Sequence, residues 1–202
     1  MMSNLVEWGF ASRPLVVDGE SGDALWVRVG PTSAIIAVVD GVGHGPAAAV
    51  AARRAVELIA AGEGEDPVRA MQRCHEGLRE TRGVALSVAW FDAEQGRMSW
   101  MGVGSVQGML LRANPRAVSP RESLMLRGGV LGRQLPVLHA SVVAVAPGDR
   151  LVFATDGVRS TFAPEWNADE PTQTLADRIL NEHGTGADDA LVVAVRYRGT
   201  AS

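Results

Sequence analysis

Short apolar runs bounded by glycine and proline recur along this chain and predict β-strands. The first two runs, residues 24–29 and 33–40, flank Gly30-Pro31 and therefore predict two strands joined by a tight turn. Later runs of the same kind predict strands at residues 84–91, 98–103, 106–112, 124–126, 141–146, 150–155 and 190–197. We expect a hairpin loop at residues 92–96, and a second hairpin in which Pro147-Gly148 joins the strands 141–146 and 150–155.

Three other segments have the apolar spacing of helices. Pro46 opens an alanine-rich stretch that ends before Gly62, and its apolar positions cover most of the circumference, which predicts a buried helix. Asp66 is suited to cap a second helix that runs to Arg82. A third helix is expected at residues 172–183.

This order of elements predicts the fold class. Helices grouped between blocks of antiparallel strands indicate an α+β protein, not an alternating parallel one. Two antiparallel sheets with helices outside would bury the strands on both faces. We expect a single domain over residues 1–202.

Composition excludes several functions. Apolar residues make up 47% of the chain, charged residues make up 21%, and the net charge of −4 disfavours a nucleic-acid surface. All 19 basic residues are arginine, so a phosphate loop or Schiff base that needs lysine is excluded, and the single cysteine excludes a multi-cysteine metal site. No apolar run reaches the roughly 20 residues that span a bilayer. The first residues lack the features of a secretory signal, so a cytoplasmic location is expected.

Several aspartates stand where an apolar strand meets a turn. Asp40 ends one strand before Gly41-Val-Gly-His-Gly45, Asp156 ends another before Gly157, and Asp188-Asp189 directly precede the last strand. Carboxylates held in this way are costly to ionise unless a cation compensates them, and their oxygens suit Mg²⁺ or Mn²⁺. Asp-Gly is also a common turn dipeptide, so each of these aspartates taken alone is explained by a turn. The prediction of a metal site rests on their occurring together.

The motifs together resemble those of the PPM (type-2C) metal-dependent serine/threonine phosphatases, in their SpoIIE-like branch. The resemblance rests on Asp40–Gly45 with the alanine-rich helix, Gly128–Gly132, Ala154-Thr-Asp-Gly157 and Asp188-Asp189-Ala190, in the order of the family. It implies an α-β-β-α sandwich with two Mn²⁺ or Mg²⁺ ions at one end of the sheets.

The resemblance also implies roles for individual residues. Asp40 would bridge both ions and take part in catalysis, and the Gly41 carbonyl would bind one of them. Asp156 and Asp189 would hold the other ion, with Asp23 and Glu20 as further acids nearby. Eukaryotic members carry a histidine directly after Asp-Gly, where this chain has Val42. His44 is therefore a candidate either for protonating the leaving group or for shaping the turn.

The length of the chain helps to choose among the subtypes of SpoIIE-like phosphatases. A chain of about this size corresponds to a bare catalytic domain, as in the stand-alone RsbX-type phosphatases, which implies phosphorylated STAS-domain proteins of the stressosome as substrates. The first alternative is a partner-switching phosphatase that acts on a phosphorylated anti-sigma-factor antagonist. A catalytically dead PPM fold used for binding, and a nucleotide-binding protein that uses Gly41–Gly45, are the others. The substrate-binding residues are not predicted.

Overall fold

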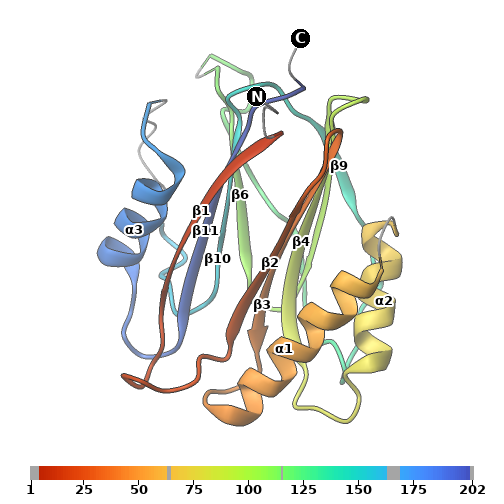
Figure 1. Ribbon diagram of the computed structural model, residues 1–202, viewed down its shortest axis with the longest axis vertical. Coiled ribbons are helices and arrows are strands. Elements are labelled where there is room, and N and C mark those ends of the chain that lie inside the picture. The colour runs from red at the N-terminus through yellow and green to blue at the C-terminus, as the bar shows by residue number, and fades with distance from the viewer. Residues whose placement is uncertain (1–4, 63–64, 115, 163–168, 201–202) are drawn as a thin grey trace.

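The structure is a computed structural model that describes residues 5–62, 65–114, 116–162 and 169–200. Three helices and eleven strands occur in these residues (Figure 1). In chain order they are β1 (Val6–Arg13), β2 (Asp23–Val29), β3 (Ser33–Gly41), α1 (Pro46–Ala61), α2 (Pro67–Gly77), β4 (Val84–Asp92), β5 (Arg97–Val103), β6 (Gln107–Leu111), β7 (Arg121–Ser123), β8 (Leu126–Arg127), β9 (Ser141–Ala144), β10 (Arg150–Ala154), α3 (Thr172–His183) and β11 (Ala190–Tyr197).

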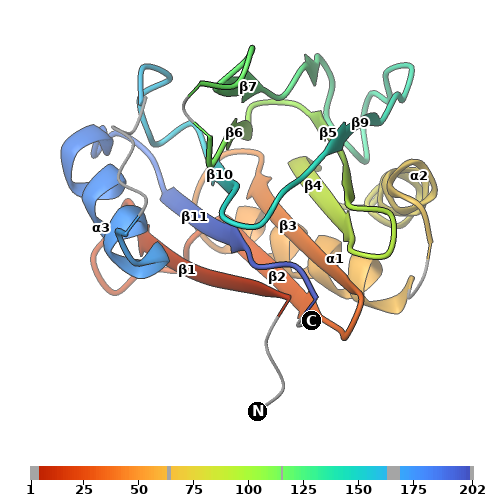
Figure 2. The same ribbon diagram turned by 90° about the horizontal axis from the view of Figure 1, so that it is seen from above.

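The strands form two sheets packed face to face. One sheet has the order β1-β11-β10-β6-β7, and the other has the order β2-β3-β4-β5-β8, with β9 also paired to β5. Helices α1 and α2 cover the outer face of the second sheet, and α3 covers the outer face of the first (Figures 1 and 2). The predicted α-β-β-α sandwich is thus confirmed. It contains a parallel pair, β5 with β8, which the sequence analysis does not foresee.

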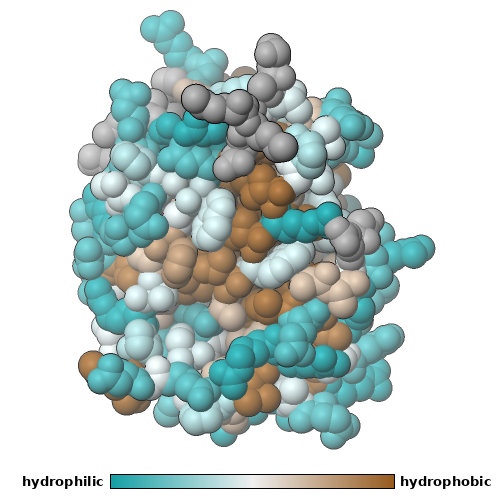
Figure 3. Space-filling view, in the orientation of Figure 1, coloured by the Kyte–Doolittle hydropathy of each residue, from teal (hydrophilic) through white to brown (hydrophobic). Residues whose placement is uncertain are grey.

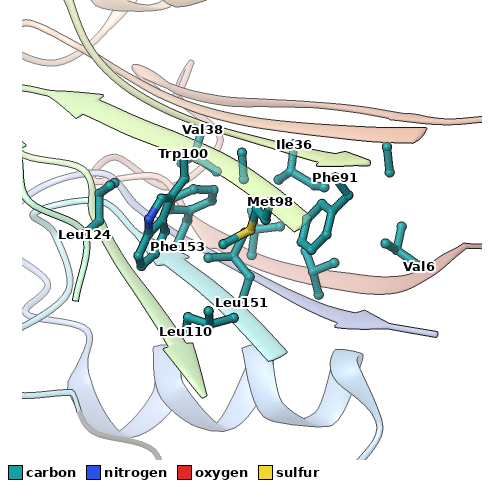
Figure 4. Close-up of a cluster of buried hydrophobic side chains, with 14 of the residues drawn as sticks. Val6, Ile36, Val38, Phe91, Met98, Trp100, Leu110, Leu124, Leu151 and Phe153 are labelled. Carbon is teal, nitrogen blue, oxygen red and sulfur yellow. The ribbon is translucent and has the colours of Figure 1, made fainter. Parts of the chain in front are cut away.

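Successive side chains of the central strands point to opposite faces of the sheet, so the core has one layer between the sheets and one under the helices on each side. On β3, Ile36 and Val38 point between the sheets, whereas Ile35, Ala37 and Val39 face the helices α1 and α2. Phe91, Trp100 and Phe153 from neighbouring strands fill the space between the sheets (Figure 4). A strand that is buried on both faces needs apolar residues at every position, and this is the pattern that predicts these strands.

Helix α1 begins at Pro46 and presents alanines to the sheet, which lets the helix approach β3 closely. Ala48, Ala52 and Ala55 are buried, and the N–H of Gly62 closes the helix by donating to Ile59 O at 3.2 Å. The same end of β3 and start of α1 frame the loop from Gly41 to Gly45. No helix in the described part of the chain is long and apolar enough to cross a membrane.

Helix α2 begins as predicted but ends earlier. The Asp66 carboxylate accepts hydrogen bonds from the backbone N–H groups of Val68 and Arg69, which confirms its capping role. The helix ends at Gly77 instead of Arg82, because both the N–H and the hydroxyl of Thr81 bond to Leu78 O and turn the chain towards β4.

The strand predictions are wrong at three places. The expected hairpin of residues 141–146 and 150–155 does not form, since β9 pairs with β5 in one sheet and β10 pairs with β6 and β11 in the other. The expected strand at residues 124–126 is interrupted, because β7 ends at Ser123 and β8 starts at Leu126. Strand β1 is not predicted at all. It is an edge strand whose polar and aromatic residues lack a continuous apolar run.

The edge strands β1 and β2 lie side by side at one open edge of the sandwich (Figures 1 and 2). Apolar side chains reach the surface there (Figure 3), among them Phe10, which is 42% exposed and stacks against Trp8. Surface apolar residues of this kind are common in globular proteins.

Candidate metal centre

Four strand ends bring aspartates together at the lower end of the sandwich in Figure 1. Asp40 lies at the end of β3, and Asp23 lies opposite it in register at the start of β2. Asp156 follows β10, and Asp188 precedes β11. Asp40, Asp156 and Asp188 line a cleft of about 420 Å³, together with Gly43 of the Gly41–Gly45 loop, Ser105, and Gly128–Val130.

Asp40 is half-buried and is held by a hydroxyl group. Ser105 Oγ donates a hydrogen bond to Asp40 Oδ2 at 2.8 Å. The pKa of Asp40 is raised to about 7, first by burial and then by the charge of Asp156, although the Ser105 hydrogen bond acts to lower it. The carboxylate is therefore fixed in position, and without a cation its ionisation is unfavourable.

Asp23 has a similar environment on the neighbouring strand. Thr155 Oγ1 donates to Asp23 Oδ2 at 2.8 Å and also accepts the N–H of Leu191 at 2.9 Å, so one hydroxyl connects Asp23 to the strand β11. Burial raises the pKa of Asp23 to about 8, with Asp40 as the next cause. Burial, and then the charge of Asp188, also raise the pKa of Asp156.

These carboxylates fit a hard divalent cation. The cleft lining contains aspartates but no arginine or histidine among the described residues, so no side chain of the lining itself neutralises their charge. No three acidic, histidine or cysteine side chains of the described ranges gather tightly enough to enclose an ion by themselves. Ions bound here would complete their coordination with water and backbone carbonyls, as Mg²⁺ commonly does.

The structure places the two adjacent aspartates before β11 differently. Both oxygens of Asp189 accept backbone hydrogen bonds at 2.7 Å, one from Leu15 N–H and one from Gly22 N–H, and the residue is only 4% exposed. Asp189 therefore ties the β1–β2 connection to β11 and is not in the lining of the cleft. The carboxylate at the cleft is that of Asp188, which the sequence analysis does not choose.

Two glycines are required by close backbone contacts around the site. A Cβ on Gly41 would lie 2.4 Å from Ala48 O, so only glycine lets the end of β3 pack against α1. A Cβ on Gly157 would lie 2.0 Å from Asp189 O, so only glycine lets the chain after Asp156 pass β11. The role of the Gly41 carbonyl as a ligand stays a prediction.

The remaining predicted residues lie outside the cleft. His44 is exposed and does not line the cleft, so its role as an acid stays a prediction. Glu20 is exposed and pairs with Arg53 on α1 at 3.0 Å. The structure thus brings together Asp23, Asp40 and Asp156, but it does not bring Glu20 or His44 to them.

Sequence reasoning missed two hydroxyl groups. Ser105 follows Gly104 at the junction of β5 and β6, and Thr155 directly precedes Asp156. Thr155 could have been noticed from its neighbour, because residues beside a buried acid often orient it. Ser105 reaches Asp40 only through the crossing of the chain from one sheet to the other, and no local pattern marks it.

A sandwich of two sheets with helices on both outer faces and an acidic cleft at one end defines the class of PPM-type protein phosphatases. Residues 30–198 match the family described as Stage II sporulation protein E (SpoIIE), so this chain belongs to the SpoIIE family and is a PPM-type phosphatase.

Individual relatives agree with this assignment. Phosphoserine phosphatase RsbX of Bacillus subtilis (strain 168) is 25% identical over 138 residues, which cover 68% of this chain and 67% of RsbX. A solved structure from work on the bacterial stressosome as a modular system for secondary messenger signaling has a TM-score of 0.86 and 28% identity, covering 95% of this chain and 99% of the other. RsbX in complex with magnesium has a TM-score of 0.80 at 17% identity, covering 97% and 99% of the two chains, which shows the shared fold.

Proposed function

We propose that this protein is a metal-dependent phosphatase that removes phosphate from phosphoserine or phosphothreonine on STAS-domain proteins of the stressosome, in the cytoplasm. The observation that carries the proposal is the group of aspartates around one cleft, two of which, Asp40 and Asp23, are half-buried and have pKa values raised to about 7 and 8. A folded protein keeps such mutual repulsion at a functional site when a bound ligand relieves it.

In this proposal Asp40, Asp156 and Asp188 hold the ions, with the Gly41 carbonyl and Asp23 beside them. Two divalent ions would supply a water of lowered pKa and neutralise the charge of the phosphoryl group. The chain itself keeps the ligands in place: Ser105 orients Asp40, and Thr155 orients Asp23. Since no side chain is needed as the nucleophile, the reaction requires no covalent phosphoenzyme.

The relatives support the proposed substrate class. The similarity to RsbX, which is a phosphoserine phosphatase, and to a structure from work on the stressosome supports stressosome proteins as targets. The alternative, a phosphorylated anti-sigma-factor antagonist, is also a STAS-domain protein, and the cleft itself does not favour one over the other. Rates of turnover of the two intact phosphoproteins separate these substrates.

Two other functions have less support. A catalytically dead fold would be expected to lack one of the acids, but the cleft keeps Asp40, Asp156 and Asp188. A nucleotide site at Gly41–Gly45 would place phosphate against the same carboxylates with no cation in the lining to attract it.

The test of the proposal is turnover of p-nitrophenyl phosphate and of a phosphoserine peptide with Mn²⁺ or Mg²⁺, compared with EDTA. We expect hydrolysis only with metal, and its loss in Asp156→Asn while the circular dichroism spectrum is unchanged. The matched control is Asp177→Asn, which changes an exposed aspartate on α3 in the same way. Metal-independent turnover, or full activity of Asp156→Asn, would contradict the proposal. Nucleotide binding measured by calorimetry without turnover would favour the nucleotide-binding alternative.

A further inference from the structure

A second hollow, of about 440 Å³, lies beside the acidic cleft and has arginines on its rim. It is lined by Ala47, Val50, Glu80, Thr81, Arg82 and Arg133. These residues come from the start of α1, the turn between α2 and β4, and the segment after Gly132. The turn lies at the lower end of the molecule in Figure 1, the end at which the aspartates meet.

Both arginines stand on segments that border the metal cleft. Arg82 Nη1 lies 3.0 Å from the position that a Cβ on Gly43 would occupy, and Gly43 lines the cleft. The next residue, Gly83, accepts a hydrogen bond from Val42 N–H at 3.0 Å, which fixes the turn against the Gly41–Gly45 loop. Arg133 N–H bonds to Val130 O at 3.0 Å, and Val130 also lines the cleft.

The two guanidinium groups have no acidic partner within the described part of the chain. Neither Arg82 nor Arg133 forms an ion pair with any residue that the structure describes. Exposed arginines on the neighbouring helix α1 are paired, since Arg53 contacts Glu20 and Arg54 contacts Glu57. Glu80 is the one carboxylate among the residues that line the hollow, so the lining carries a net positive charge beside a strongly negative cleft.

We propose that Arg82 and Arg133 bind acidic side chains of the protein substrate next to its phosphorylated residue. This inference rests on the proposed phosphatase function and adds the chemistry of the segment that flanks the phosphosite. Arg82 and Arg133 line the neighbouring hollow and not the cleft, so the proposal assigns them the residues beside the phosphoserine and not the phosphoryl group itself. Exposed Val42 and Val50 add apolar surface beside them, which suits a protein segment better than a free anion.

The experiment compares two phosphoserine peptides that differ only in whether glutamate or glutamine flanks the phosphoserine. With the wild-type protein, kcat/KM is expected to be about three- to tenfold higher for the glutamate peptide, as two exposed ion pairs would give. The preference should weaken at high salt. The double variant Arg82→Ala/Arg133→Ala should lose the preference and keep the wild-type rate on p-nitrophenyl phosphate, which fills only the cleft. Arg69→Ala, at an exposed position near the start of α2, is the control for loss of an arginine elsewhere on the surface and should behave as wild type.

The possible outcomes separate the role of the two arginines from the phosphatase function itself. Equal turnover of the two peptides by the wild type, or a preference that persists in the double variant, would overturn the inference while leaving the phosphatase function intact. A drop on p-nitrophenyl phosphate equal to that on the glutamate peptide would overturn it too, because it would place the arginines in the cleft. Absence of metal-dependent turnover of every substrate would instead overturn the proposed function, and the inference with it.

Discussion

Asp188 and Asp189 are adjacent aspartates for which the structure predicts opposite consequences of the same substitution. Asp189→Asn replaces one carboxylate oxygen by an amide that cannot accept the hydrogen bond now received from Leu15 or Gly22. It also removes the charge that strengthens the other bond. The loss of one charge-assisted bond and the weakening of a second should cost about 3 kcal/mol, which for a domain of this size lowers Tm by about 6–12 °C.

Asp188→Asn should leave the metal-free protein as stable as wild type or more stable. Its carboxylate raises the pKa values of Asp156 and Asp40, so neutralising it relieves repulsion. The Asn side chain can still accept the N–H of Asp189 through its amide oxygen, as Asp188 Oδ1 does at 2.8 Å. What this variant should lose is binding of Mn²⁺ and phosphatase activity.

Thermal unfolding followed by circular dichroism in EDTA and then with added Mn²⁺ measures both effects. Binding to the folded state raises Tm with metal concentration, so wild type and Asp189→Asn should show this rise and Asp188→Asn should not. The reasoning is refuted if Asp189→Asn unfolds like wild type in EDTA and loses the metal response, while Asp188→Asn keeps it. Asp189 would then be the ligand, as the sequence analysis expects.

Two further predictions concern pH and His44. Asp40 and Asp23 have raised pKa values of about 7 and 8 in the folded chain, against about 3.9 when unfolded, so the folded state binds protons more tightly. The metal-free protein should therefore lose stability as pH rises from about 4 to 8. Asp40→Asn should make this loss smaller. A Tm in EDTA that rises over this pH range would contradict the prediction. His44→Ala should slow the hydrolysis of p-nitrophenyl phosphate and of a phosphoserine peptide to a similar, small extent, because His44 does not line the cleft. A loss of about 100-fold in the hydrolysis of the peptide alone would instead assign general-acid catalysis to His44.

Structural features that are determined by residues close together in the chain are predicted from the sequence. The apolar run of β3 is recognisable because the strand is buried on both faces, and the bounds of α1 follow from Pro46 and Gly62. Asp40 and Asp156 are predicted as site residues because each ends such a strand before a glycine. The meeting of these strand ends in one cleft then follows from the sandwich.

Features that depend on pairing between distant segments are not predicted. Residues 141–144 and 150–154 look like a hairpin locally, but β5 and β6 offer partners in different sheets and separate them. Which of Asp188 and Asp189 faces the cleft could not be predicted for a related reason. Successive side chains at the start of a strand point to opposite sides, and only the position of Gly22 shows which side is the cleft.

The most direct test of the central claim is the measurement of kcat/KM with Mn²⁺ on three substrates. These are an intact phosphorylated STAS-domain scaffold protein of a stressosome, an intact phosphorylated anti-sigma-factor antagonist, and a phosphopeptide that spans the scaffold site. We predict the highest value for the scaffold protein and a much lower value for the peptide, because a folded partner offers contact area around the cleft that a peptide lacks. Preference for the antagonist would support the alternative substrate, and equal turnover of peptide and intact protein would contradict recognition of a folded partner.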